Sequence, residues 1–348
     1  MMLSDSMNTD AIQSKRERTR MGYRLAVLAL VVALLAMALP SITSAFWLRT
    51  FTSTAIFALA SSGAALLYGR LGLVSLAQVA LLGAGAWVAL RLSFAAPLPF
   101  ELIILATGLS TALAGLVIGL PALRVRGLYL ALVTLMFAGG FQVIITTTGF
   151  PDGGGGLLGR VSGGARLSMA RPWIAQSDEA YFRYVLVMVV LGFLLVELHK
   201  RSRAGRAWAV IRRSEAGALS AGVHVTVYKT WAFMLSGFLS GIAGALLAGS
   251  VGQLDGRNFP ASDSILLFAL TVVGGAYSWV GQVIAALLFR AVPALLDSFG
   301  VNGNIALIIF GAALLQALIT APAGTAGQLA DLVAAIRRRL GSAQEQQQ

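Results

Sequence analysis

The feature that most constrains this chain is a succession of apolar segments, each about as long as a helix that crosses a bilayer. Such a helix needs roughly 20 predominantly apolar residues. Only 11% of the 348 residues are charged, against about 25% in soluble domains. The sequence therefore predicts an all-α, polytopic membrane protein. The predicted spans are residues 25–47, 52–68, 72–90, 99–120, 128–148, 181–198, 230–250, 263–280, 282–298 and 303–320.

Two of these segments leave the number of crossings open. The segments 72–90 and 282–298 can each be a broken or re-entrant helix, because non-helical backbone is tolerated at membrane depth where it lines a cavity. The prediction is therefore roughly 8–10 transmembrane helices. Thr43-Ser44-Ala45 resembles a signal-peptidase site, but the apolar stretch continues through Trp47, which predicts an uncleaved first span.

The distribution of Lys and Arg orients the predicted spans. With the connecting segments assigned alternately, 18 of the 26 Lys and Arg residues lie on the side of the two termini and seven on the other side. The positive-inside rule then places both termini in the cytoplasm. The net charge of +12 follows from this orientation and does not indicate a nucleic-acid partner. The predicted parts are a basic tail at 1–24, a transmembrane domain at 25–320 and a cytoplasmic tail at 321–348.

Two connecting loops are long enough to carry a function. The outer loop, 149–180, is rich in glycine, and the inner loop, 199–229, carries a dense run of basic residues. Within the inner loop, residues 206–221 favour a helix that is too polar to cross the membrane. A short surface helix is suited to docking in a groove of a cytoplasmic partner. A loop that is basic only because it faces the cytoplasm is the alternative, and composition does not separate the two.

The motifs of several enzyme classes are missing from the sequence. There is no cysteine, and the two histidines have no metal-binding spacing. No lysine follows a glycine, which excludes a Walker A phosphate loop, and no G-x-S-x-G nucleophile elbow occurs. Gly154–Gly159 match G-x-G-x-x-G, but without the strand and helix of a dinucleotide site. We therefore expect no catalytic residue, cofactor or metal, and any ATP that drives this protein is hydrolysed by another polypeptide.

Small residues and a few charges stand out within the predicted spans. Gly237 with Gly241, and Gly115 with Gly119, have the four-residue spacing that allows close helix packing in lipid. Arg290 and Asp297 are seven residues apart, on roughly one helical face. A charge at membrane depth suggests a functional site by default, so Arg290 belongs either to a structural ion pair or to a substrate pathway.

The inner loop resembles the cytoplasmic coupling segment of the branched-chain amino acid permeases, the M-type membrane subunits of leucine/isoleucine/valine ABC importers. That family carries a pattern close to S-x-x-G-R-A-x-x-A-I-R-x-x-E-x-A-A-x-x-x-G. The matching residues are Ser202, Gly205, Arg206, Ala207, Ile211, Arg212, Glu215, Ala218 and Gly222, whereas the first alanine of the A-A pair is Gly217 here.

Two further segments carry the same resemblance, in the order that the family has them. Residues 123–135 are similar to the family's L-R-x-R-G-x-Y-L-A-x-x-T-L, and residues 72–78, with Gly83, Gly85, Ala86 and Trp87, match its G-x-x-S-L-x-x segment and the G-x-G-A that follows. The matches extend over about residues 55–325. Three segments depart from the family: Gly149 is followed by Phe150-Pro151-Asp152, the usual G-G-x-G-x-x-x-G-P reads Gly274–Gln282 with Tyr277 and Gln282, and the usual A-P-x-G-L-x-G is Ala321–Gly327.

The resemblance implies the permease subunit of an ABC importer in the bacterial inner membrane. Its expected partners are a second, homologous permease subunit, two cytoplasmic ABC ATPase subunits, a periplasmic substrate-binding protein and membrane lipid. The implied substrate is a branched-chain or related apolar amino acid. Urea or a short amide remains an alternative because residues 274–282 depart from the family. A stand-alone secondary transporter, in which Arg290 and Asp297 take part, is the alternative from another class.

The matched segments also suggest which residues act. Arg206, Arg212, Glu215 and Gly222 are predicted to couple the chain to the ATPase, with Arg212 and Glu215 positioning the helix at the partner's surface. The substrate pathway is predicted to include Ser75, Gln78, Tyr129 and Thr134, which are polar residues of matched segments, together with Arg290. Packing roles remain open for the pathway residues.

Overall fold

The computed structural model describes residues 33–122, 124–125, 127–161 and 166–300, with single positions at 305, 308, 311, 312 and 327. In this part of the chain the regular structure is helical, with no β-strand, which confirms the predicted fold class. A first helix, Ala33–Ile42, precedes the labelled ones. The labelled helices are α2 (Ala45–Leu71), α3 (Gln78–Ala95), α4 (Phe100–Ala122), α5 (Leu128–Thr148), α6 (Asp178–Arg201), α7 (Arg203–Arg213), α8 (Glu215–Ser220), α9 (Val225–Val251), η1 (Gly256–Asn258), α10 (Ala261–Gly274), α11 (Trp279–Ala286), η2 (Leu287–Ala291) and α12 (Val292–Ser298).

Seven helical segments of the described chain are long and apolar enough to cross a membrane. They are α2, α3, α4, α5, α6, α9 and the continuous segment Trp279–Ser298. The chain is therefore a multi-pass membrane protein. The predicted span 303–320 and the two predicted tails lie outside the described residues, apart from the isolated positions.

The first predicted boundary is wrong by several residues. The sequence suggested a break between residues 47 and 52, around Arg49, but α2 already begins at Ala45. Arg49 lies inside the helix, where its exposed side chain donates from Nε to Asp178 Oδ2 of α6 at 2.8 Å. The predicted boundary was misplaced because a charged residue was taken to mark the end of a span, whereas Arg49 continues the helix.

The predicted span 72–90 begins later than expected, at Gln78. Residues 72–77 are non-helical, and the last three of them, Ser75, Leu76 and Ala77, are buried. The Leu76 N–H donates to Thr134 Oγ1 of α5 at 2.8 Å, and the Val79 N–H donates to Ser264 Oγ of α10 at 3.3 Å. Side chains of neighbouring helices thus satisfy backbone groups that the irregular segment leaves open, as membrane depth requires.

The predicted span 263–280 is also corrected. Its helix, α10, has 14 residues and ends at Gly274, which gives a length of about 21 Å against a hydrocarbon core of about 30 Å. Gly275 ends it with a φ of +112°, a conformation that favours glycine. The helix that follows, Trp279–Ser298, contains a π-helical stretch at Leu287–Ala291, and π-bulges are frequent at functional sites.

The core of the molecule is α9, packed against α3 and α4. Glycines make this contact close: a Cβ on Gly85 would lie 2.7 Å from the Gly241 Cα, and a Cβ on Gly115 or Gly237 would overlap backbone atoms of the facing helix. The predicted close packing of Gly115, Gly119, Gly237 and Gly241 is thereby confirmed. Dispersion contacts of this kind hold helices together where lipid removes the hydrophobic drive.

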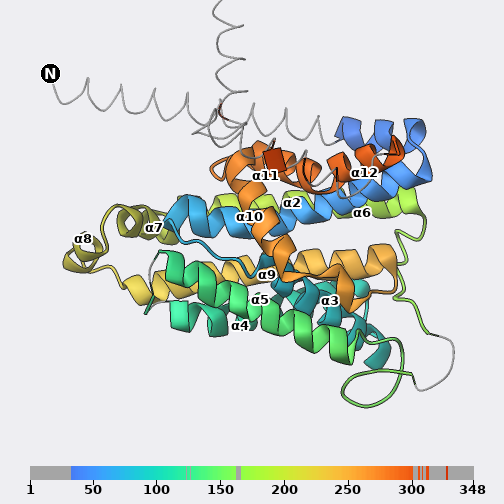
Figure 1. Cartoon of the computed structure of the whole chain (residues 1–348), viewed down its shortest axis with the longest axis horizontal. Helices are drawn as coiled ribbons and strands as arrows, with labels where there is room; N and C mark the ends of the chain where they lie inside the picture. The colour runs from blue at the N-terminus through green and yellow to red at the C-terminus, as the bar shows by residue number, and fades with distance from the viewer. Residues whose placement is uncertain are drawn as a thin grey trace, which may run out of the picture. The chain divides into compact units, whose positions relative to one another are not determined.

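The two long loops lie at opposite ends of the helices (Figure 1). Helices α7 and α8 lie at one end, and the connection between α5 and α6 lies at the other. In that connection Asp152 is buried, accepts from the Val161 N–H at 2.6 Å and pairs with Arg160 and Arg166 at 3.5 and 3.6 Å. The two loops precede and follow α6, and a helix that crosses the membrane must place them at opposite ends.

Candidate functional site

The segment between α6 and α9 forms two short helices, where the sequence predicted one over 206–221. Ser202 caps the start of α7 by accepting from the Ala204 N–H, and Ser214 caps α8 by accepting from the Gly217 N–H, both at 3.1 Å. Serine is among the preferred N-cap residues because its hydroxyl satisfies an open N–H. Ser214 therefore interrupts the helix and lets α8 take a new direction.

Local backbone geometry explains why two positions of the matched pattern, Gly205 and Gly222, are glycines. A Cβ on Gly205 would overlap the Lys200 carbonyl, so only glycine permits the tight corner between α6 and α7. Gly222 has a φ of +75°, and the Val223 N–H donates to the Ala218 carbonyl at 2.9 Å, which is the Schellman termination of α8. No neighbouring atom lies within 4 Å of a Cβ placed on Gly222. Its part in the pattern is explained by the turn.

The inner face of α7 packs against α9 through Trp208. This side chain is fully buried, and its Nε1–H donates to the Tyr228 carbonyl at 2.9 Å. Ala207 and Ile211 are buried on the same face. A buried tryptophan with its N–H satisfied is a firm attachment.

The predicted coupling residue Glu215 binds within its own chain. Its Oε1 lies 2.5 Å from the Nζ of Lys229, in the first turns of α9. The Lys229 side chain is 5% exposed, so the ammonium depends on this carboxylate for its charge partner. The pair fixes α8 to the end of the long central helix.

Arg212 attaches the end of α7 to α2 and to the connection between α10 and α11. One guanidinium nitrogen donates to the Gly69 carbonyl at the end of α2, and the other donates to the Tyr277 hydroxyl at 2.5 Å. The guanidinium also lies over the Tyr277 ring, 5.1 Å from its centroid. Arg212 and Glu215 thus contact this chain's own membrane helices. Arg206 is exposed on α7, as Arg212 is, but within the described residues it has no attachment of this kind.

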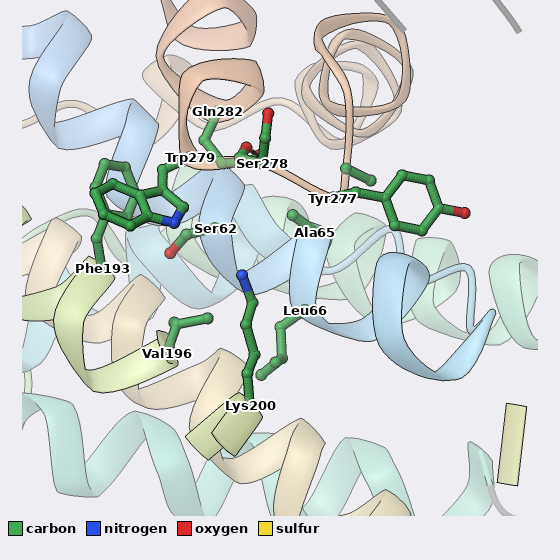
Figure 2. A pocket seen from close by; sticks show the side chains of 11 residues that line it. Ser62, Ala65, Leu66, Phe193, Val196, Lys200, Tyr277, Ser278, Trp279 and Gln282 are labelled. Atoms are coloured by element: carbon green, nitrogen blue, oxygen red, sulfur yellow. Dashed lines mark hydrogen bonds between the residues drawn. The ribbon is translucent and has the colours of Figure 1, made fainter. Parts of the chain in front are cut away.

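A small pocket lies beside these attachments. It is lined by α2, α6, α11 and the connection between α10 and α11, through Ser62, Ala65, Leu66, Phe193, Val196, Lys200, Ala276, Tyr277, Ser278, Trp279 and Gln282. Figure 2 shows the Lys200 ammonium pointing into the pocket, whereas the Tyr277 hydroxyl points away from it. Lys200 is also paired with Glu197 at 3.4 Å. The pocket is mostly apolar, with one cation at its side.

Three of the predicted pathway residues lie together in the interior, around the start of α3. Ser75, Gln78 and Thr134 are all buried. Gln78 donates to Ser236 Oγ at 2.7 Å and accepts from Ser240 Oγ at 2.6 Å, both in α9. Thr134 accepts from Leu76 and donates to a carbonyl of its own helix. Because Gln78 and Thr134 are engaged in these bonds, they hold the irregular segment against α5 and α9.

The other two predicted pathway residues lie elsewhere. Tyr129 is 71% exposed on the outer face of α5. Arg290, in the π-helical stretch, donates from Nε to Ser53 Oγ at 2.9 Å and lies over the Phe57 ring. Asp263 of α10 is the acidic group whose charge acts on it, while Asp297 is exposed on α12. The structure therefore does not bring all five predicted residues to one place.

Sequence reasoning missed several residues that connect the helices. Lys229 binds Glu215, and Tyr277 accepts a hydrogen bond from Arg212. In addition, Ser61, Thr271 and Gln282 form a buried polar cluster between α2, α10 and α11. Tyr277 and Gln282 departed from the family pattern, which was a signal that this region differs. Lys229 gave a weaker signal, as one of three lysines in a chain that otherwise uses arginine.

Together, the multi-pass helical fold and the short amphipathic helix pair at one end define a membrane permease. Residues 46–318 match the family model described as branched-chain amino acid transport system / permease component. The match extends over most of the chain, so this protein belongs to that family.

Individual relatives agree with the family. The high-affinity branched-chain amino acid transport system permease protein LivM of Salmonella typhimurium is 28% identical over 320 residues, which is 86% of this chain and 74% of the relative; LivM of Escherichia coli gives the same values. The ribose import permease protein RbsC of Bacillus subtilis is 30% identical over 145 residues, 38% of this chain and 43% of that protein. No solved structure matches significantly.

Proposed function

We propose that this chain is the membrane-spanning subunit of an ATP-driven importer for branched-chain or related apolar amino acids, in the bacterial inner membrane. The observation that carries the proposal is the α7–α8 segment. It resembles the family's coupling segment residue by residue and is tied to α2, α9 and the α10–α11 connection through Arg212, Glu215 and Trp208. The sequences of the LivM relatives support the same reading.

The outer face of α7–α8 is the surface offered to a cytoplasmic ATPase. Arg206, Arg213, Val210 and Leu219 are exposed there. A short helix with apolar and basic side chains fits a groove on a partner. ATP is hydrolysed in two such partner subunits, since the chain itself has no phosphate-binding loop.

The inner attachments then carry the motion of the ATPases into the membrane. When the ATPases close on ATP they displace α7–α8 as one piece, because Ser214 fixes the turn between the two helices and Gly222 fixes the turn that follows α8. The Glu215–Lys229 pair moves the end of α9, and Arg212 moves the end of α2 and the α10–α11 connection. A change at the cytoplasmic surface becomes a change in helix packing, which is the requirement for alternating access.

The outer face of α5 is the surface where a second, homologous permease subunit packs. Gly139 and Gly140 have no atom within 4 Å of an added Cβ, whereas the glycines of α9 are used in helix contacts. Small residues in lipid allow close helix approach. Tyr129 lies on this face, so a pathway between the two subunits exposes its hydroxyl to a substrate delivered by a periplasmic binding protein.

Co-purification tests the proposal. The tagged chain is isolated from its native membranes in mild detergent, and the accompanying proteins are identified by mass spectrometry. The proposal expects stoichiometric P-loop ATPase subunits and a second permease. Recovery of the chain alone in several detergents contradicts it and favours a secondary transporter that uses Arg290. Competition of uptake by leucine, isoleucine and valine, against urea and acetamide, then assigns the substrate.

A further inference from the structure

The connection between α10 and α11 is a rigid part of the molecule. The Gly275 N–H donates to the carbonyls of Thr271 and Val272, and Ser278 caps α11 by accepting from the Gly281 N–H at 3.1 Å. Ala276 lies against Gly69 of α2, where a Cβ on Gly69 would be 2.6 Å from the Ala276 carbonyl oxygen. The four-residue connection therefore has little freedom to move independently of α2.

A buried polar cluster fixes the same connection from its other side. Gln282 donates to the carbonyls of Gly275 and Ser278, at 3.2 and 3.1 Å, and accepts from Ser61 Oγ of α2 at 2.8 Å. Ser61 is also 2.8 Å from Thr271 Oγ1. A fully satisfied network of this kind holds its elements in one arrangement. The ends of α2, α10 and α11 thus form one block.

Tyr277 is the side chain through which this block contacts the α7–α8 segment. Its hydroxyl accepts from Arg212 at 2.5 Å while its ring lies beneath the guanidinium. The planar guanidinium can stack on a ring and donate at its edge at the same time, which lysine cannot do. The other donor of Arg212 reaches the Gly69 carbonyl of the same block. Figure 2 shows the Tyr277 hydroxyl pointing away from the pocket that its neighbours line.

We infer that Tyr277 is a positioning residue, which transmits displacement of α7–α8 through Arg212 to the α2/α10/α11 block and so to the pocket beside it. This inference rests on the proposed importer function. It assigns a second route, separate from the Glu215–Lys229 pair, which ends on α9. Tyr277 and Gln282 stand where this chain departs from the family pattern, so the route depends on residues particular to this chain.

The test compares transport with ATP hydrolysis in the co-purified complex, reconstituted in vesicles. Tyr277→Phe removes the hydroxyl and keeps the ring. We expect substrate transported per ATP hydrolysed to fall about fivefold, as the loss of one ordinary net hydrogen bond between exposed side chains predicts, while ATP hydrolysis persists. The matched control is Tyr184→Phe, because the Tyr184 hydroxyl has no hydrogen-bond partner, and it should leave the ratio unchanged. An unchanged ratio in Tyr277→Phe overturns the inference.

A double-mutant cycle separates transmission through Arg212 from a general structural effect. Arg212→Lys combined with Tyr277→Phe should be no worse than the more damaging single variant, because both changes break one contact. Multiplied losses show that the two residues act independently, and this result also overturns the inference.

A distance measurement distinguishes failure of this inference from failure of the proposed function. The chain has no cysteine, so spin labels can be placed specifically at the exposed positions Ala216 and Val280. We expect a narrow distance distribution in the wild type and a broader one in Tyr277→Phe, whether or not the complex transports amino acids. Equal widths contradict the contact, whereas absence of ATP-driven uptake by the wild type contradicts only the importer.

Discussion

Helices α9 and α5 have similar apolar sequences and opposite surroundings. In the most apolar window of α9, 83% of the residues are buried within the chain, against 28% for α5. A Cβ added to any glycine inside α9 would meet another helix, whereas a Cβ added to Gly139 or Gly140 of α5 would have no described atom within 4 Å. The difference teaches that apolar composition alone does not say whether a helix faces its own chain, lipid or a partner. Glycines with open space beside them, such as Gly139 and Gly140, indicate a helix face that a partner can approach closely.

The largest expected effect breaks the packing of α9. Gly244→Leu places a side chain where a Cβ already overlaps the backbone of α3, and overpacking at backbone contact costs more than about 3 kcal/mol. We expect no folded protein in detergent by size-exclusion chromatography. The matched control is Gly140→Leu, which should elute as wild-type chain. A folded Gly244→Leu variant would show that the α3–α9 contact is not as close as described.

The second prediction concerns assembly through α5. Gly140→Leu should retain the fold and lose the second permease subunit in co-purification, since leucine prevents close helix approach. Gly140→Ala should lose only part of it. If Gly140→Leu binds the second subunit as the wild type does, the outer face of α5 faces lipid and the comparison with α9 loses its functional meaning.

The third prediction tests the attachment of α8 to α9. Lys229→Ala removes the ion pair between Lys229 and Glu215, and we expect a loss of about 2 kcal/mol in unfolding free energy, less than for a fully buried pair because Glu215 is partly exposed. Uptake should fall strongly. The reversed pair, Glu215→Lys with Lys229→Glu, should recover part of both. Absence of any recovery means that Glu215 acts on the partner and not on α9.

The smallest expected effects distinguish two polar residues in the first half of α5, Thr134 and Tyr129. Thr134→Val removes the acceptor of the buried Leu76 N–H and should lower stability by about 1–2 kcal/mol, measured by thermal unfolding in detergent. Tyr129→Phe should leave stability unchanged, because its hydroxyl is on the exposed face, and should alter only the apparent affinity for substrate. A stability loss in Tyr129→Phe would place Tyr129 in an internal contact.

Some of this structure could be predicted because its cause is local. The glycine spacing in α4 and α9 predicted close helix packing, and the matched coupling pattern located the α7–α8 segment. The reasons for Gly205 and Gly222 are also local, since one allows a corner and the other a turn. The position of the seven apolar helices of the described chain follows from segment length, with errors where a charged residue such as Arg49 lies inside a helix.

What could not be predicted depends on contacts between distant parts of the chain. Lys229 lies 14 residues from Glu215, and Tyr277 lies 65 residues from Arg212. No local pattern specifies either pairing. Residues 72–77 read as an apolar span because their backbone partners, Thr134 and Ser264, belong to other helices. Polarity likewise selected Gln78 as a pathway residue, although both of its described partners are serines of α9.

The most direct test of the central claim is uptake of labelled leucine into vesicles that contain the co-purified complex, with its binding protein outside and ATP inside. The account predicts accumulation against a gradient that requires ATP and is abolished by Glu215→Lys, while membrane insertion and assembly of the chain are retained. Accumulation without ATP, or normal uptake by Glu215→Lys, would contradict an ATP-driven permease coupled through the α7–α8 segment.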